Sequence, residues 1–336
     1  MFLKKLSILI CISLLVSILL FSLTACEKED VTVIKLSEVT HSVFYAPQYA
    51  AISQGFFEEE GLQVEVTNAQ GADKVLTAVI SGDADIGLCG PEASVYVYNQ
   101  GKDDYATSFA QLTKRDGSFI VGREPDPNFT FDKLIGKDVL GGRKGGMPLM
   151  SLQWVLNENG IDPDKDVNID TSIQFAALAG AFKGGTGDYV SLFEPTALAL
   201  EKEGAGYVVA SLGVASGEVP YTCYNATNSY IAKNPDTIQK FTNAIYKGQI
   251  WVKEHSPEEI AESIAEFFPD TNLQDLTTVV KRYKNQDSWN LTPELSEDAF
   301  DHMQDIMESA GELDQRAPYD NLVTTIFAKE AMNTIK

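Results

Sequence analysis

The chain has 336 residues and a formal net charge of −22 at pH 7, from 48 acidic and 26 basic side chains. A surface this acidic repels nucleic acid and anionic lipid headgroups, so we expect no nucleic-acid partner. About 310 residues follow Cys26, which is enough for two domains of ordinary size.

The N-terminus has the features of an export signal. A short basic start, "MFLKK", precedes the apolar run "LSILICISLLVSILLFSL", which has about the length that spans a bilayer. The run ends in "LTAC", which resembles the bacterial lipoprotein signal. This resemblance implies that residues 1–25 are a cleaved signal peptide and that a lipid on Cys26 anchors the chain to the extracytoplasmic face of the cell membrane. An uncleaved anchor helix is the alternative, and it places the chain on the same side.

Two cysteines, Cys89 and Cys223, remain beyond the signal and Cys26. Neither has the spacing of a metal site, and His41 has no second histidine nearby, so we expect no metal and no cofactor. A single disulfide between the two cysteines is less favoured than two buried thiols.

Strand-like and helix-like runs alternate beyond the signal. Strands are predicted over 31–39, 62–67, 84–90, 138–142, 167–171, 188–193 and 206–212, and helices over 45–57, 72–82, 91–101, 148–160, 175–185 and 195–204. This rhythm predicts parallel sheets covered by helices, an α/β fold. From about Asn234 onward the pattern is helical, as over 235–255 and 257–268.

Two segments resemble each other, "LTAVISGDADIGLCGPEAS" and "LAGAFKGGTGDYVSLFEPTAL". Each has an apolar helix, a turn, a buried strand and a helix that starts near proline. An acid neighbours that proline in each half, Glu92 after Pro91 and Glu194 before Pro195. The echo predicts two similar α/β lobes. Ligands of open α/β sheets bind beyond the carboxyl ends of the strands, so both acids are expected to face the cleft.

Four stretches together resemble the substrate-binding proteins of ABC importers, in the group that serves alkanesulfonates, taurine and thiamine-precursor pyrimidines. The stretches are "FYAPQYAAISQGFFEEEGLQVEV", "LTAVISGDADIGLCG", "FDKLIGKDVLGGRKGGMPLMSLQWVLNENGI" and "AFKGGTGDYVSLFEP". The resemblance is continuous over residues 32–215 and less specific in the C-terminal helices. It implies a two-lobed fold of the periplasmic-binding-protein type II, with two mixed sheets flanked by helices and a ligand cleft between the lobes.

The resemblance also implies a domain organisation. Lobe 1 would comprise residues 26–115 and return over 223–336, and lobe 2 would comprise residues 116–222, with crossing strands near 113–121 and 220–231. The expected partners are a small-molecule ligand, an ABC permease and its ATPase, and the chain is expected to be a monomer.

The loop "GGRKGGMP" could suggest a phosphate-binding loop. A P-loop needs GxxxxGK followed by Ser or Thr, and here Gly146 precedes Met147 and Pro148. The resemblance instead places the loop at the cleft, where glycines allow close approach to a ligand and Arg143 or Lys144 could clamp an anion. Charges that point into solvent are the alternative for these two side chains.

Further candidates come from "EVTHSVFYAP" and "GPEAS", which follow two strands of the first half. Aromatic rings there would stack on a heteroaromatic ligand, and Glu92 would accept from its amino group. Core packing is the alternative for the aromatics, and a favourable position beside the helix dipole is the alternative for Glu92. The predicted ligand-binding residues are His41, Ser42, Phe44, Tyr45, Gly90, Pro91, Glu92, Gln111, Arg143, Lys144, Gly145, Gly146, Phe175, Phe193 and Glu194.

These residues favour an amino-bearing heteroaromatic ligand, such as a thiamine-type aminopyrimidine, because two acids would repel an anion. Arg143 and Lys144 leave an alkanesulfonate, taurine or another small anion as the alternative ligand. The sequence has no G-x-S-x-G elbow, no HExxH and no ordered Cys/His pair, so no enzyme is expected. An extracellular pyrimidine-processing enzyme or hydrolase, and a signalling or adhesion lipoprotein, are the alternatives from other classes.

Overall fold

The computed structural model describes residues 31–336. The predicted signal peptide and the lipid site at Cys26 lie outside these residues. Within residues 31–336 no helix is long and apolar enough to cross a membrane.

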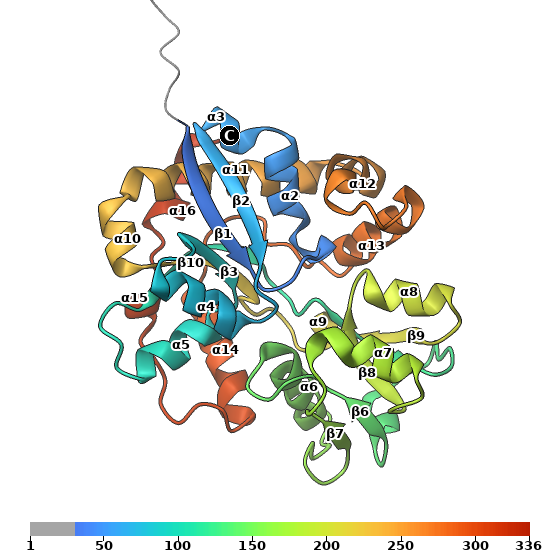
Figure 1. The fold of residues 1–336 in the computed structure, drawn as a ribbon. Helices are drawn as coiled ribbons and strands as arrows, with labels where there is room; N and C mark the ends of the chain where they lie inside the picture. The colour runs from blue at the N-terminus through green and yellow to red at the C-terminus, as the bar shows by residue number, and fades with distance from the viewer. Residues whose placement is uncertain (1–30) are drawn as a thin grey trace, which may run out of the picture. The chain divides into compact units, whose positions relative to one another are not determined.

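The first sheet has five strands in the order β2-β1-β3-β10-β4 (Figure 1). Its strands are β1 (Thr32–Glu38), β2 (Leu62–Asn68), β3 (Ile86–Cys89), β4 (Ala106–Thr113) and β10 (Thr222–Thr227). β1 and β3 are parallel, whereas β10 runs antiparallel to both β3 and β4. Cys89 and Cys223 face each other on β3 and β10, and both are free and buried, as the sequence favoured.

The second sheet also has five strands, in the order β7-β6-β8-β5-β9. Its strands are β5 (Ser118–Gly122), β6 (Asp138–Leu140), β7 (Asn168–Asp170), β8 (Tyr189–Phe193) and β9 (Tyr207–Ser211). β6 is parallel to β7 and β8, and β5 is antiparallel to β8 and β9. Both sheets are therefore mixed. The chain passes from the first sheet to the second over 114–117 and returns over 212–221, so each sheet forms the centre of one lobe.

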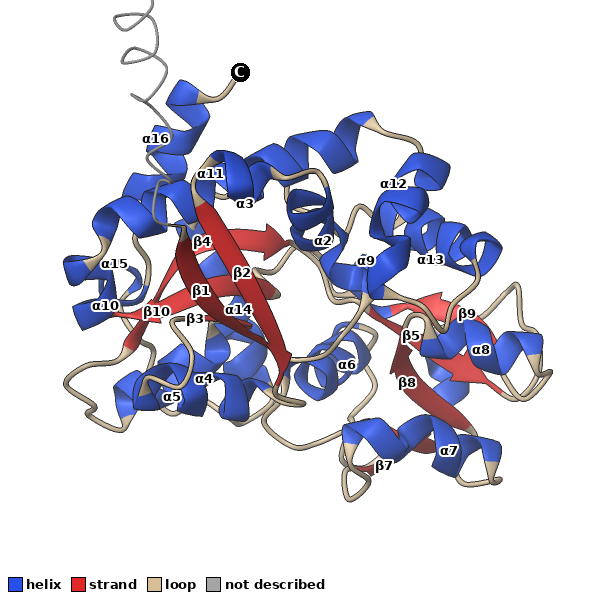
Figure 2. Cartoon of the chain, turned by 45° about the horizontal axis from the view of Figure 1, so that its top comes forward, coloured by secondary structure: helices blue, strands red, loops and turns tan. Residues whose placement is uncertain are grey.

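Helices cover both faces of the first sheet (Figure 2). One face carries η1 (Val43–Tyr45), α2 (Ala46–Ser53), α3 (Phe56–Glu59), α11 (Pro235–Glu254), α12 (Pro257–Ile264), η4 (Ala265–Phe267), α13 (Leu273–Asn285) and α16 (Ile326–Thr334), and the other carries α4 (Ala72–Ser81) and α5 (Glu92–Asn99). The remaining helices of this lobe are α10 (Asn228–Lys233), α14 (Glu297–Ser309) and α15 (Tyr319–Leu322). In α11 the buried residues include Ile238, Phe241, Ile245 and Val252. This helical spacing gives α11 one apolar face, which packs against α2.

The second lobe has a smaller core on each face of its sheet. One face is covered by α6 (Met147–Glu158) and α9 (Leu212–Ala215), and the other by α7 (Leu178–Lys183) and α8 (Thr196–Lys202). Two short 3-10 helices, η2 (Phe131–Leu134) and η3 (Phe175–Ala177), complete the lobe. At the N-terminal end of α6, Met147 and Met150 belong to the core of the first lobe. The two lobes are therefore in direct contact beside this helix end.

A candidate ligand site between the lobes

Aromatic rings from both lobes meet at the boundary. The Phe44 ring centroid lies 5.8 Å from that of Phe193, 5.7 Å from that of Tyr221 and 5.1 Å from that of Tyr283. A β-carbon added at Gly117 would lie 2.7 Å from the Phe193 ring and 2.8 Å from the Phe44 ring. Real β-carbons essentially never approach atoms this closely, so only glycine fits where the chain crosses between the lobes.

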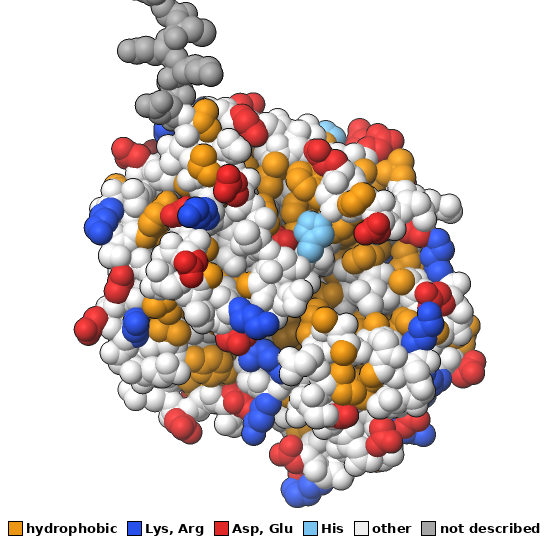
Figure 3. Space-filling model, in the orientation of Figure 1, with side chains coloured by type: hydrophobic (Ala, Val, Ile, Leu, Met, Phe, Trp, Pro, Cys, Tyr) orange, Lys and Arg blue, Asp and Glu red, His pale blue; other side chains and the backbone are white. Residues whose placement is uncertain are grey.

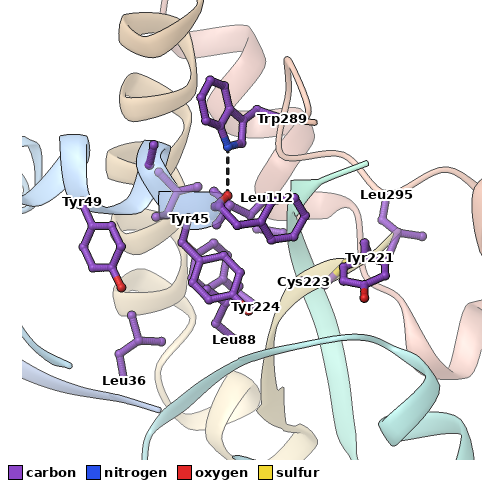
Figure 4. Close-up of a cluster of buried hydrophobic side chains, with 14 of the residues drawn as sticks. Leu36, Tyr45, Tyr49, Leu88, Leu112, Tyr221, Cys223, Tyr224, Trp289 and Leu295 are labelled. Atoms are coloured by element: carbon purple, nitrogen blue, oxygen red, sulfur yellow. Dashed lines mark hydrogen bonds between the residues drawn. The ribbon is translucent and has the colours of Figure 1, made fainter. Parts of the chain in front are cut away.

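The same boundary is held by hydrogen bonds to backbone atoms. Ser42, which caps η1, donates from its hydroxyl to the Glu194 carbonyl at 2.9 Å. The Tyr283 hydroxyl accepts from the Glu194 N–H at 3.0 Å and donates to the Gly117 carbonyl at 3.2 Å. Figure 4 shows the Trp289 indole, which donates to the Phe44 carbonyl at 2.9 Å. The Ser42 and Tyr283 bonds hold the first lobe against the end of β8, and the Trp289 bond holds Phe44 in place within the first lobe.

Glu92 is the acid of the first lobe. It opens α5 directly after β3, and only 4% of the residue is exposed. Its Oε2 has no hydrogen-bond partner among the described residues. Burial raises the pKa of the Glu92 carboxyl to about 7, although the Arg143 charge and the N–H groups of Glu92 and Ala93 act in the opposite direction. A buried acceptor without a partner costs free energy, so this oxygen is suited to bind a donor group of a ligand.

Glu194 occupies a different environment from Glu92. Its Oε1 is paired with the Arg282 guanidinium of α13, and its Oε2 accepts from the Leu198 N–H at 2.8 Å. Arg282 also pairs with Glu201 on α8. Burial raises the pKa of the Glu194 carboxyl against the opposing charge of Arg282. Both Glu194 oxygens thus have protein partners, and its predicted contact with a ligand stays a prediction.

The GGRKGG loop connects β6 to α6 and contacts the first lobe. The Arg143 guanidinium lies 3.3 Å from the Asp73 carboxylate, and the Lys144 ammonium lies 3.8 Å from the Glu312 carboxylate. The Gly145 carbonyl accepts from the Tyr96 hydroxyl at 3.3 Å. On the face drawn in Figure 3, basic side chains likewise lie beside acidic ones near the boundary. Both basic side chains of the loop are therefore paired with acids rather than aimed together at one point.

His41 connects the segment that follows β1 to η4 among the C-terminal helices. Its Nδ1 lies 3.0 Å from the Glu38 carboxylate, and its Nε2 lies 2.7 Å from the Phe267 carbonyl. Nε2 donates to the Phe267 carbonyl, and the Tyr49 hydroxyl also lies 2.9 Å from Nδ1, so Nδ1 has both the Glu38 carboxylate and this hydroxyl as neighbours. The bond to Glu38 raises the pKa of His41 accordingly. In the described part of the chain, no group of three His, Cys, Asp or Glu side chains is placed to hold a metal ion.

Of the other predicted residues, one lies at the boundary between the lobes, and the rest pack inside an element or lead into a helix. Phe175 lies on the boundary, with its ring 5.6 Å from that of Phe193 and 40% of the residue exposed. Tyr45 is buried beside Phe44, and burial raises the pKa of its hydroxyl. Gln111 donates to the Thr113 carbonyl within β4 at 3.0 Å. Gly90 and Pro91 lead into α5, with Gly90 pressed against the Glu92 carboxylate, and Gly146 precedes α6 as its cap.

Sequence reasoning missed Asp116, Ser151 and Tyr221. All three are buried, and the Asp116 Oδ2, Ser151 Oγ and Tyr221 hydroxyl have no hydrogen-bond partner within residues 31–336. Burial raises the pKa of Asp116 to about 6, and the nearby Ser118, Ser151 and Tyr221 act in the opposite direction. In the sequence, Asp116 stands in "KRDGS", which is typical of an ordinary turn.

A comparison with protein families identifies the chain. The family model described as "NMT1/THI5 like" matches residues 43–260, well over half of the sequence. The chain belongs to the NMT1/THI5-like family. The matched range includes Phe44, Glu92, Asp116 and Tyr221, and it confirms the resemblance predicted from the sequence motifs.

Known relatives of this NMT1/THI5-like chain support the assignment. It is 49% identical over 313 residues to "Putative binding protein YtlA" of Bacillus subtilis. The aligned residues make up 93% of this chain and 94% of the relative. Its fold matches that of the alkanesulfonate-binding protein SsuA from Xanthomonas axonopodis bound to MOPS, with a TM-score of 0.70, 16% identity and coverage of 90% and 100% of the two chains. The fold also matches that of the nitrate-binding protein NrtA from Synechocystis, with a TM-score of 0.68, 18% identity and coverage of 91% of this chain and 90% of that chain. The predicted type II fold of two mixed sheets is therefore confirmed.

Proposed function

We propose that this chain is the extracytoplasmic solute-binding lipoprotein of an ABC importer. It captures a small organic nutrient between its lobes and delivers it to a permease and its ATPase. The NMT1/THI5-like family, the two-lobed fold and the binding proteins among its relatives support this role. A lipid on Cys26 keeps the monomer at the outer face of the membrane, next to the permease.

The proposed ligand is an amino-bearing heteroaromatic compound of the thiamine-type pyrimidine class. The observation that carries this choice is the buried Glu92 carboxylate, whose Oε2 has no partner among residues 31–336. A ligand amino group would donate to that oxygen, whereas a sulfonate would be repelled by it. Arg143 and Lys144, the residues that favoured an anion, are already paired with Asp73 and Glu312.

The aromatic rings at the boundary suit a flat ligand. Phe44 and Phe193 approach each other from the two lobes, and Tyr221 lies against both. When the lobes open, a heteroaromatic ring could stack between these side chains, and closure would exclude water from the Glu92 contact. This arrangement provides both apolar area and an oriented acceptor.

We propose binding without catalysis. Cys89 and Cys223 are the cysteines of the described chain, and burial raises the pKa of both thiols well above its ordinary range. Because the thiolate is the reactive form, neither side chain is prepared to act as a nucleophile.

A binding screen tests the proposal. Thermal-shift measurements with 4-amino-5-hydroxymethyl-2-methylpyrimidine, thiamine, taurine and ethanesulfonate should show stabilisation by a pyrimidine, because a ligand that binds only the folded state raises its stability. Calorimetry should then show that Glu92→Gln weakens binding tenfold or more, as expected for the loss of a charge-assisted hydrogen bond. Arg143→Gln is the matched control and should change the affinity less than threefold.

Two results would overturn this assignment. Stabilisation by a sulfonate alone, together with loss of binding in Arg143→Gln, would identify an anion-binding protein. Conversion of the pyrimidine by the purified protein would identify an enzyme.

A further inference from the structure

Helix α13 contacts the second lobe although it belongs to the first. It packs against α12 and η1, which are both elements of the first lobe. Figures 1 and 2 both show α13 next to α8 of the second lobe. Two charged residues of α13, Asp275 and Arg282, pair with residues at either end of α8. We call this line of charges between the two helices the α8–α13 seam.

Arg282 bridges two carboxylates of the second lobe. Its guanidinium pairs through one nitrogen with Glu194 at the end of β8, and through the other with Glu201 on α8. The Glu194 side chain is fully buried and the Arg282 side chain is partly buried, so solvent ions screen these pairs less than pairs on an open surface. If the lobes separated, both carboxylates would lose the same cationic partner.

A second ion pair extends the α8–α13 seam away from the crossings. The ammonium of Lys202, the last residue of α8, lies 2.5 Å from the Asp275 carboxylate. Asp275 precedes Arg282 by about two helical turns, which is roughly 10 Å along the helix axis. The other end of α13 lies at the first crossing, where Gln286 donates to the Asp116 carbonyl at 2.6 Å. The seam therefore runs from the crossing outward between the two lobes.

The ion pairs at the crossings have a different arrangement. Lys114 and Arg115 of the first crossing each lie 3.3 Å from the carboxylate of Glu218 in the second crossing. Lys114 also lies 2.7 Å from the Asp287 carboxylate, just beyond α13. These pairs join segments that stay adjacent when two lobes rotate about their connections. They can therefore persist whether the lobes are open or closed.

We infer that the α8–α13 seam is an electrostatic latch, which holds the two lobes together before any ligand binds. Arg282 and Asp275 supply the charges of the first lobe, and Glu194, Glu201 and Lys202 supply those of the second. Contacts that form in only one of two conformations shift the equilibrium toward that conformation. The latch requires only the two-lobed fold and does not depend on which solute the cleft binds. Glu194 thus has a role in closure, whether or not it also contacts a ligand.

Small-angle scattering of the ligand-free protein, at one fixed pH and ionic strength, tests the latch. Arg282→Gln removes the charge that bridges the lobes and should increase the radius of gyration above that of wild type. Lys202→Glu places two acids opposite each other and should also increase it. Lys202→Glu combined with Asp275→Lys reverses the pair and should restore the wild-type radius. These last two variants change exposed or partly exposed side chains, so they test the latch even if Arg282→Gln does not fold.

Two control variants remove ion pairs that do not join the lobes. Arg316→Gln removes a guanidinium that also pairs with two carboxylates, Asp305 and Glu308, but within the first lobe. Glu218→Gln removes pairs between the crossings. Both should keep the wild-type radius, and circular dichroism should confirm that each variant is folded. An unchanged radius in folded Arg282→Gln and in Lys202→Glu, an equal expansion in the controls, or no restoration by the reversed pair would overturn the latch. Because no ligand is present, none of these outcomes bears on the proposed solute.

Discussion

Replacement of Glu92 by glutamine should stabilise the ligand-free protein at alkaline pH. Glu92 is 4% exposed, and burial raises its pKa from an ordinary 4.5 to about 7. A carboxyl whose pKa is raised in the fold favours the folded state at low pH. That contribution declines as the pH rises above 4.5, and it is lost once the pH exceeds the folded pKa of about 7.

The size of the effect follows from the shift. A change of about 2.5 pKa units corresponds to roughly 3 kcal/mol of unfolding free energy. For a chain of this length, 1 kcal/mol changes Tm by about 2 °C, so the Tm difference should approach roughly 6 °C. Glu92→Gln and wild-type protein should melt at similar temperatures at pH 5, and the variant should melt higher at pH 8.5.

Differential scanning fluorimetry from pH 5 to 9, without ligand, measures this difference. Glu194→Gln is the matched control, since its carboxylate is equally buried but paired with Arg282. In Glu194→Gln, Arg282 keeps only Glu201 as a charged partner, so this variant should not gain the stability expected of Glu92→Gln at pH 8.5. If Glu92→Gln melts no higher than wild type at pH 8.5, the Glu92 carboxylate has a compensating partner and the reasoning about its free oxygen fails.

Two further substitutions test closure and anchoring. Gly117→Ala places a methyl group 2.7 Å from the Phe193 ring, and this clash should cost about 1–3 kcal/mol in the closed form. Small-angle scattering should therefore show less compaction with ligand than in wild type. Equal compaction would contradict a close contact at the crossing. Cys26→Ala should accumulate as an unprocessed precursor without lipid label, and normal processing with labelling would reject the predicted anchor.

The sequence predicted the strands and helices correctly in the parts of the chain where the two alternate. The predicted strand over 62–67 is β2, and the helix predicted over 72–82 is α4. β4 was not predicted, because β4 and β5 follow each other without a helix between them, whereas β5 and β10 overlap the crossing strands predicted near 113–121 and 220–231, although their antiparallel pairing in the sheets was not predicted. Their place is determined by tertiary pairing across the crossings, which local periodicity does not encode.

The candidate site was predictable in part for a similar physical reason. Ser42 and Phe44 follow a strand, and Glu92 follows another, so local order placed them at the cleft. Arg282 and Tyr283 come from α13, about 90 residues beyond Glu194 in the chain, and only the packed structure shows that they reach it. From the sequence alone, the two acids of the repeated segments look equivalent. The structure pairs Glu194 with Arg282, whereas Glu92 Oε2 has no partner among residues 31–336.

The hydrogen bonds that Ser42 and Tyr283 of the first lobe make across the boundary end on backbone atoms, namely the Glu194 N–H and carbonyl and the Gly117 carbonyl. Every amino acid except proline supplies the same backbone groups. Substitution of the Glu194 side chain, or of other lining side chains apart from Ser42 and Tyr283, therefore leaves both groups of each of these bonds in place. A fold built in this way can diversify its specificity over evolutionary time while keeping one closed geometry for the transporter to recognise.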